Sequence, residues 1–254
     1  MIKRYAIYFA VLFATGISSG VAHAGKIVLA NDEWTLSDSG YSANPANTNQ
    51  FVQNVVSWFD GSLSGGKLLA YSNNFGLTGT NLNNSITNTG NTWTVSTGIT
   101  FDLATLSQYS AIFLAGNPAN NQVLIDYVNH GGNVYLAGGT GGGGAAAEAA
   151  QWNTFLNAFG LGFGAFYNGV GGNIAINSNH PIFNNITSLY ENNGNNTLDI
   201  SLGDPRGQVL VDQGGNGLYA VYDSGGNPVP EPATMLLFGT GLVGLAGIIR
   251  RRKV

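Results

Sequence analysis

The sequence predicts an α/β fold, a three-layer sandwich in which helices cover both faces of a mostly parallel β-sheet. Short, continuously apolar runs recur along residues 25–228, as expected for strands that are buried on both faces. Segments with one apolar helical face separate these runs, and such alternation is typical of parallel sheets. With 254 residues, of which 44% are hydrophobic, the chain is long and apolar enough to bury a sizeable core.

The strands expected in this sheet are short apolar runs bounded by polar or glycine-rich segments. They are residues 26–30, 67–71, 111–115 and 134–137. Near the end of the body, residues 208–212 and 218–222 flank a glycine-rich turn at 214–217, and this arrangement predicts a β-hairpin.

The helices expected between the strands carry apolar residues at helical spacing. The first begins at Asn47 or Thr48 and ends at Gly61, because Asn and Thr cap helix starts and glycine follows helix ends. Another begins at Asn120 or Asn121. The remaining helical segments are residues 82–86, a single turn at 103–106, and residues 145–159.

Charged residues are few and unevenly placed. They make up 9% of the chain, and the formal net charge of −4 argues against a nucleic-acid-binding protein. Six of the nine Lys and Arg residues lie at the two ends of the chain. The body between them keeps only Lys26, Lys67 and Arg206 as basic side chains. We therefore predict two terminal targeting segments and an acidic body.

The chain contains no cysteine. This excludes disulfide bonds, metal sites built from thiolates, and a cysteine nucleophile. Asn, Gly, Ser and Thr dominate the body, so neutral polar groups solvate its surface, and salt screens such a surface little.

Residues 1–24 are typical of a secretory signal peptide. Lys3 and Arg4 precede an apolar stretch, and small residues in an A-x-A pattern follow it. The residues at the predicted cleavage site are Ala22, Ala24 and the new N-terminus Gly25. A transmembrane anchor is the alternative, but the apolar run is short for a hydrocarbon core of about 30 Å.

The last segment, residues 229–254, combines three features in a fixed order. The first is the run Val229, Pro230, Glu231 and Pro232. An uncharged, mostly apolar stretch follows at 233–249, and as a helix it would span about 25 Å of membrane. A basic cluster then follows, which stays on the cytoplasmic side: Arg250, Arg251, Arg252 and Lys253. We predict a single transmembrane helix here, with the body outside the cytoplasm.

This tail resembles the PEP-CTERM sorting signal of Gram-negative bacteria. In that family the tail is read by exosortase, an integral-membrane cysteine protease that cleaves near the Pro-Glu-Pro motif. The resemblance implies exosortase as a partner, membrane attachment through the C-terminal helix before processing, and a cell-surface or extracellular destination afterwards. Such proteins often accompany extracellular polysaccharide production, so polysaccharide is a candidate partner. The resemblance implies nothing about the activity of the body.

Part of the body resembles class I glutamine amidotransferase-like domains, above all their ThuA-like branch, which implies a flavodoxin-like arrangement. The resemblance rests on residues 106–114, on the helix, Gly-Gly and strand at 123–134, and on His180-Pro181-Ile182. The family places its catalytic cysteine on the turn after this strand, where this chain has residues 137–140 without a cysteine. The histidine usual in the ThuA-like branch is also absent. The resemblance therefore implies a scaffold without that chemistry.

Asp32 and Glu33 follow the first predicted strand, where open α/β sheets place their ligand crevice. With Asn31 or Asn117 they are the candidate ligands for Mg²⁺ or Ca²⁺, and a solvated turn is the alternative. The glycine-rich segment 140–144 precedes a helix and could cradle phosphate, but it lacks the lysine of a P-loop. A flexible connection is the better interpretation of that segment.

Histidines and aromatic residues complete the candidates. His130 and His180 stand at unrelated positions, and no G-x-S-x-G motif accompanies them, so neither a metal cluster nor a catalytic triad is expected. Aromatic side chains that could stack on sugar rings are Tyr41, Trp93, Tyr167 and Tyr190, although core packing is their commoner role.

We predict an exported cell-surface or extracellular-matrix protein whose body has no catalytic residues and no cofactor. The alternatives are a carbohydrate-binding module and a hydrolase-like enzyme on an amidotransferase-like scaffold. Acids or histidines converging at the carboxyl ends of the strands would favour the enzyme, and a row of exposed aromatic residues would favour sugar binding.

Overall fold

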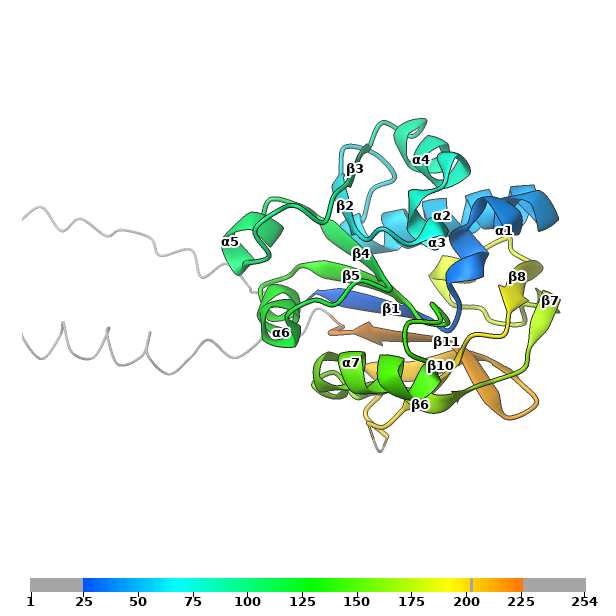
Figure 1. Cartoon of the computed structure of the whole chain (residues 1–254). Helices are drawn as coiled ribbons and strands as arrows, with labels where there is room; N and C mark the ends of the chain where they lie inside the picture. Colours follow the sequence, from blue (N-terminus) through cyan, green and yellow to red (C-terminus); the bar gives the residue numbers. More distant parts are fainter. Residues whose placement is uncertain (1–24, 202, 226–254) are drawn as a thin grey trace, which may run out of the picture.

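A nine-stranded sheet forms the centre of the computed structural model, which describes residues 25–201 and 203–225 (Figure 1). The strand order is β3-β2-β4-β5-β1-β11-β9-β6, with β10 pairing β11. The parallel block contains β1 (Lys26–Ala30), β2 (Lys67–Tyr71), β3 (Thr92–Val95), β4 (Ala111–Ala115) and β5 (Asn133–Ala137). The prediction of an α/β fold with a mostly parallel sheet is confirmed.

The other four strands of this sheet pair antiparallel. They are β6 (Leu161–Tyr167), β9 (Asn195–Asp199), β10 (Gly207–Gln213) and β11 (Asn216–Asp223). The β10–β11 hairpin confirms the predicted hairpin. A second sheet pairs β7 (Gly171–Ala175) with β8 (Ser188–Asn192).

Helices cover both faces of the sheet (Figure 1). The first face carries α1 (Asp38–Ala43), α2 (Pro45–Asp60), α3 (Phe75–Thr78) and α4 (Thr80–Thr87). The second face carries α5 (Leu103–Leu106), α6 (Asn121–Asn129) and α7 (Ala145–Asn157). Two short 3-10 helices, Glu33–Leu36 and Pro181–Phe183, complete the described elements. Helices on both faces agree with the expected layers. The parallel strands, however, follow the order β3-β2-β4-β5-β1 and not the 2-1-3-4-5 order of a flavodoxin-like sheet, so that finer expectation is wrong.

Two helix boundaries differ from the prediction. Helix α2 begins at Pro45 after Asn44, so Asn47 and Thr48 lie inside the helix and do not cap it. The reason is Pro45, whose fixed φ suits the first helical position. Helix α7 ends at Asn157, two residues before the predicted end. The cap at Asn120 is confirmed, since its side chain accepts from the backbone N–H groups of Gln122 and Val123.

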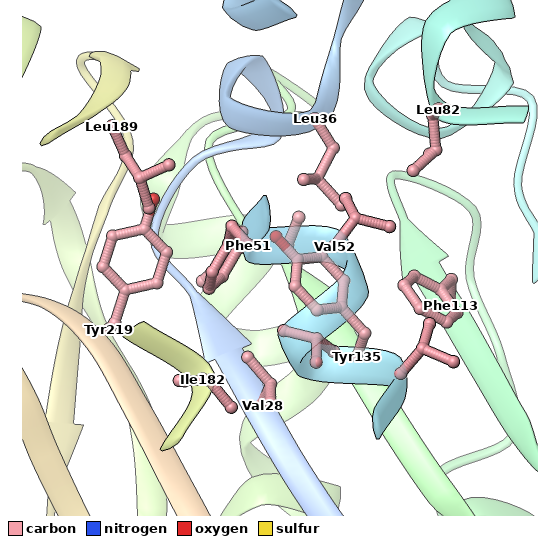
Figure 2. Close-up of a cluster of buried hydrophobic side chains, with 14 of the residues drawn as sticks. Val28, Leu36, Phe51, Val52, Leu82, Phe113, Tyr135, Ile182, Leu189 and Tyr219 are labelled. Atoms are coloured by element: carbon pink, nitrogen blue, oxygen red, sulfur yellow. The ribbon is translucent and has the colours of Figure 1, made fainter. Parts of the chain in front are cut away.

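The core on the first face is rich in aromatic rings. Phe51 of α2 lies between the sheet residues Tyr135 and Tyr219, with ring centroids 6.5 and 5.5 Å away (Figure 2). Tyr135 stacks on Phe113 of the neighbouring strand at 5.1 Å. The second face packs Trp152 and Phe155 of α7 against the same sheet. Alternate residues of each strand therefore serve the two layers, as expected for strands buried on both faces.

We call the end of the sheet where β1, β2, β4 and β5 begin the amino pole, and the end where they finish the carboxyl pole. The two ends of the body meet at the amino pole, because Lys26 of β1 pairs with Asp223 of β11. Gly25, the first described residue, is buried there and donates its N–H to the carbonyl oxygen of Val128 at 2.6 Å.

Several predicted features lie outside the described residues. They are the signal peptide at 1–24, the motif at 229–232, the apolar segment at 233–249 and the basic cluster at 250–253. Within residues 25–201 and 203–225, no helix has both the length and the apolar character needed to cross a membrane.

Candidate functional site

Four buried carboxylates gather at the carboxyl pole. Asp32 follows β1, Glu33 begins the first 3-10 helix, Glu148 lies in the first turn of α7, and Glu191 belongs to β8. All four side chains are buried, so the alternative interpretation of Asp32 and Glu33 as a solvated turn is wrong. The charge of Glu148 raises the pKa of Asp32 and of Glu33, and the charge of Asp32 raises the pKa of Glu33 and of Glu191. The four acids therefore form one electrostatic cluster. We call it the acidic cluster.

The sheet brings these residues together because β1 and β5 end side by side, with Ala30 opposite Ala137. The chain after β5 stays against β1, since the Gly138 N–H donates to the Ala30 carbonyl at 2.9 Å. A side chain at Gly138 or Gly139 would press on the backbone of Asn31, which explains why glycine follows the strand. The Gly-Gly pair is thus a close-packing feature of the carboxyl pole.

Asp32 connects two segments that are far apart in the sequence. Its Oδ1 accepts the Trp34 N–H at 2.9 Å and caps the 3-10 helix. Its Oδ2 accepts the backbone N–H of Asn192, at the end of β8. Both oxygens are therefore committed to backbone donors.

Glu148 fastens the glycine-rich turn to α7. Its Oε2 accepts the Gly139 N–H at 2.9 Å, and its Oε1 accepts the Thr140 hydroxyl at 2.6 Å. A carboxylate that already occupies the first turn of α7 disfavours a bound phosphate at the same helix start. The structure thus argues against the phosphate-cradle interpretation of residues 140–144.

Glu191 is fully buried in a polar network. Its Oε1 accepts the hydroxyl of Tyr219, and Thr35 bridges the two residues with a 3.0 Å contact to the Tyr219 oxygen. Its Oε2, both side-chain atoms of Asn31, and the Tyr135 hydroxyl have no hydrogen-bond partner of good geometry among the described residues. The Tyr135 and Tyr219 side chains reach this network from the core shown in Figure 2.

Glu33 lies at the outer side of the cluster. It accepts a hydrogen bond from the Asn74 amide, which follows β2. Next to it, Trp34 and the exposed Phe75 form an edge-to-face pair with ring centroids 4.8 Å apart.

Burial dominates the electrostatics of the cluster. Loss of solvent raises the pKa of Asp32 from 3.8 to about 6, and the charge of Glu148 adds to this. Burial likewise raises the pKa of Glu33 from 4.5 to about 7, with Asp32 and Glu148 contributing. Burial and the Asp32 charge hold the pKa of Glu191 well above its usual range. Burial therefore makes Asp32, Glu33 and Glu191 harder to ionise than the same groups in water.

The acidic cluster does not have the form of a metal site. No group of three or more His, Cys, Asp or Glu side chains in the described ranges could hold a metal ion. Of the predicted helpers, Asn117 directs its Oδ1 to the Asn73 N–H at 2.6 Å. The two oxygens of Asp32 already accept backbone N–H groups.

The predicted histidines lie elsewhere. His130 ends α6, with its Nδ1 2.6 Å from the Asp126 carbonyl oxygen. His180 lies at the amino pole, where its ring stands edge-on to Trp58 with centroids 5.1 Å apart. Neither residue is among the contacts of the acidic cluster.

Two of the four predicted sugar-stacking residues serve packing, while Tyr167 and Tyr190 are half-buried. Tyr41 is buried and donates to Ser85 at 2.7 Å. Trp93 packs edge-to-face on Phe113 at 5.1 Å, so it supports the core. Trp58 of α2 packs partly against the core and also lines a cavity of about 640 Å³ at the amino pole, which we call the Trp58 cavity. Lys26, Asn54, Asn179 and Asn184 line the same cavity.

Comparison with known proteins identifies the tail. Residues 228–253 match the PEP-CTERM protein-sorting motif. No curated protein and no solved structure matches the chain. The chain thus carries the tail of an exported protein that exosortase sorts, and the resemblance of the body to amidotransferase-like domains stays a prediction.

Proposed function

We propose that this is a cell-surface or extracellular-matrix protein with a non-catalytic body, delivered by a signal peptide and a membrane-inserted tail. The PEP-CTERM motif at residues 228–253 carries the proposal, because it implies export and processing by exosortase. Before processing, the apolar segment at 233–249 anchors the chain in the membrane. Afterwards the body is attached at the cell surface or released.

Acids converging at the carboxyl pole are the feature that was expected to favour an enzyme, but the hydrogen bonding of the acidic cluster supports a non-catalytic body. Asp32 and Glu148 use both carboxylate oxygens to hold backbone N–H groups and the Thr140 hydroxyl. A catalytic acid or base must reach the atom with which it exchanges a proton. The fully buried Asp32 and Glu191 lack that access, so the convergence of acids here serves the packing of the carboxyl pole.

Replacement of Pro230, Glu231 and Pro232 by alanine should leave full-length protein in the membrane fraction, because exosortase then lacks its recognition sequence. Immunoblots of membrane, surface and culture fractions measure this. Alanine at Gly226 and Asn227, which lie just outside the matched motif, is the control and should leave processing intact. Unchanged size and export of the triple variant would rule the proposal out.

A second candidate function, binding of the producer's extracellular polysaccharide, is favoured by the Trp58 cavity. An indole ring beside amide side chains offers an apolar face and several hydrogen-bonding groups, the combination that orients a polar ligand in a pocket. The ammonium group of Lys26 lies 4.9 Å from the centre of the Trp58 ring.

Trp58→Ala should therefore abolish retention of the purified mature protein on that polysaccharide. Trp34→Ala, which removes a half-buried indole at the opposite pole, is the matched control and should bind normally. Equal retention of both variants and the parent protein would contradict binding at this cavity.

A further inference from the structure

The folded body leaves only a short stretch of chain before the sorting motif. Strand β11 ends at Asp223, and Ser224 after it is buried. The Gly225 N–H still donates to the Asp223 carboxylate at 2.9 Å. The last described residues are therefore held at the amino pole, next to the first strand of the body.

Chain geometry limits how far the motif can lie from this pole. Five peptide units separate Gly225 from Pro230, and they reach at most about 18 Å when fully extended. A body of this size has a radius of gyration of about 16 Å, hence a diameter of about 40 Å. The connection therefore cannot bring Pro230 to the carboxyl pole, whatever conformation it adopts.

We propose that the amino pole is the surface on which exosortase docks during processing, while the carboxyl pole with its acidic cluster faces away. This rests on the proposed function, in which exosortase cuts the tail of the folded, exported chain. An enzyme that engages Pro230 must approach within about 18 Å of the amino pole, so a protein-sized protease contacts it.

The composition of the pole suits a transient protein contact. Three serine- and glycine-rich segments, residues 62–66, 107–110 and 130–133, surround a polar cavity of about 530 Å³. Transient interfaces are more polar than permanent ones, and this rim has exposed serine hydroxyls and few charges.

The charges of the pole favour a protease over the lipid surface. All three basic residues of the body lie here: Lys26 and Lys67 begin their strands, and Arg206 binds the Asp223 N–H through its carbonyl oxygen. Acidic groups balance them, because Arg206 pairs with Asp204 at 2.6 Å and Lys26 lies opposite Asp223. The pole therefore lacks the excess of basic charge that holds proteins on anionic lipids.

The absence of native cysteine allows a direct test with single-cysteine variants of the full chain. Ser62→Cys and Ser107→Cys place a thiol at exposed sites of the amino pole, and Ser42→Cys places one at an exposed site of α1 near the carboxyl pole. Precursor is accumulated in cells depleted of exosortase, and spheroplasts of these cells are labelled with a large polyethylene-glycol maleimide. Exosortase is then restored, and conversion to the mature form is followed by immunoblot.

The bulky label should abolish conversion at Ser62 and Ser107 and leave conversion of the Ser42 variant equal to that of unlabelled protein. N-Ethylmaleimide on the same three thiols should leave conversion intact, which separates bulk from loss of the serine. Equal conversion of all three bulky conjugates overturns the proposal. If the two amino-pole thiols do not react with the label in the absence of exosortase, lipid covers the amino pole, and this result also overturns the proposal. If the unlabelled parent chain is not converted to the mature form, the proposed function itself is wrong.

Discussion

Raising the pH from 5 to 8 should lower the melting temperature of the mature protein by at least about 3–6 °C. Asp32 carries this effect, because burial raises its pKa from 3.8 to about 6 in the folded chain. Because pH 5 lies about one unit below the folded pKa of about 6, Asp32 loses about 1.4 kcal/mol of stabilisation between pH 5 and pH 8, and about 1 kcal/mol moves the melting temperature of a domain of this size by about 2–4 °C.

The sign follows from proton binding. Between pH 4 and pH 7 the folded chain holds protons on Asp32 and Glu33 that the unfolded chain releases. The stability contributed by these groups is therefore complete below their unfolded pKa values and is lost as the pH rises through about 6 and 7. Glu191 acts in the same direction, since its pKa is also raised.

Scanning calorimetry of the double variant Asp32→Asn, Glu33→Gln measures the contribution of the cluster. Its melting temperature should depend on pH much less steeply than that of the parent protein. Asp126→Asn, on the surface of α6, is the matched control and should keep the parent's dependence. A parent melting temperature that stays constant or rises between pH 5 and 8 would refute the argument.

Gly25→Ala should destabilise the body by about 3 kcal/mol or more, at the upper end of overpacking effects. A Cβ at this position would overlap the carbonyl oxygen of Gly132, and backbone atoms cannot move aside as a flexible side chain can. Because Gly25 is buried between β1 and the end of α6, the added methyl group cannot move out into solvent.

This variant also separates folding from signal cleavage. Alanine is small, so Gly25→Ala keeps the small residues around the predicted cleavage site after Ala24. Cleavage there would place the new α-ammonium group against the Val128 carbonyl, at the carboxyl end of α6, where positive charge is favourable. We expect normal cleavage but less folded protein, measured by protease resistance and urea unfolding. Gly142→Ala, on the glycine-rich turn, should behave like the parent, because its Cβ would meet only the Thr140 Oγ1 at an ordinary contact distance of 3.6 Å. Parent-like unfolding of Gly25→Ala would show that the contact is not tight.

Four of the five parallel strands could be predicted because each is a continuous apolar run, whereas the fifth, β3 (Thr92–Val95), is mostly exposed and was not predicted. Residues such as Ile27, Leu69 and Ile112 lie in continuous apolar runs, and those runs became β1, β2 and β4. Strands β7 and β9 lack such runs, since Gly171–Ala175 and Asn195–Asp199 are rich in glycine and asparagine. Their pairing partners hold them in place, and a local pattern does not contain that information.

The acidic cluster was only half predictable for a similar reason. Asp32 and Glu33 follow a recognisable strand, so the carboxyl pole was the expected position. Glu148 lies in an alanine-rich helix, and Glu191 lies in a short strand of the small second sheet. Only the tertiary structure brings Glu148 and Glu191 next to Asp32 and Glu33. The one available signal was an isolated acid in a sparsely charged chain, which suggests a specific partner without identifying it.

The pairing of Lys26 with Asp223 also bears on how the chain can be rewired. Because the first and last strands of the body lie side by side, a short linker could join the two ends of the body. New ends could then be opened at Gly142, in the exposed turn before α7. Such a circular permutant would keep every strand pairing while moving the point of attachment to the opposite side of the molecule. The same body could then be attached to a cell through its carboxyl pole, with the Trp58 cavity at the amino pole facing the medium.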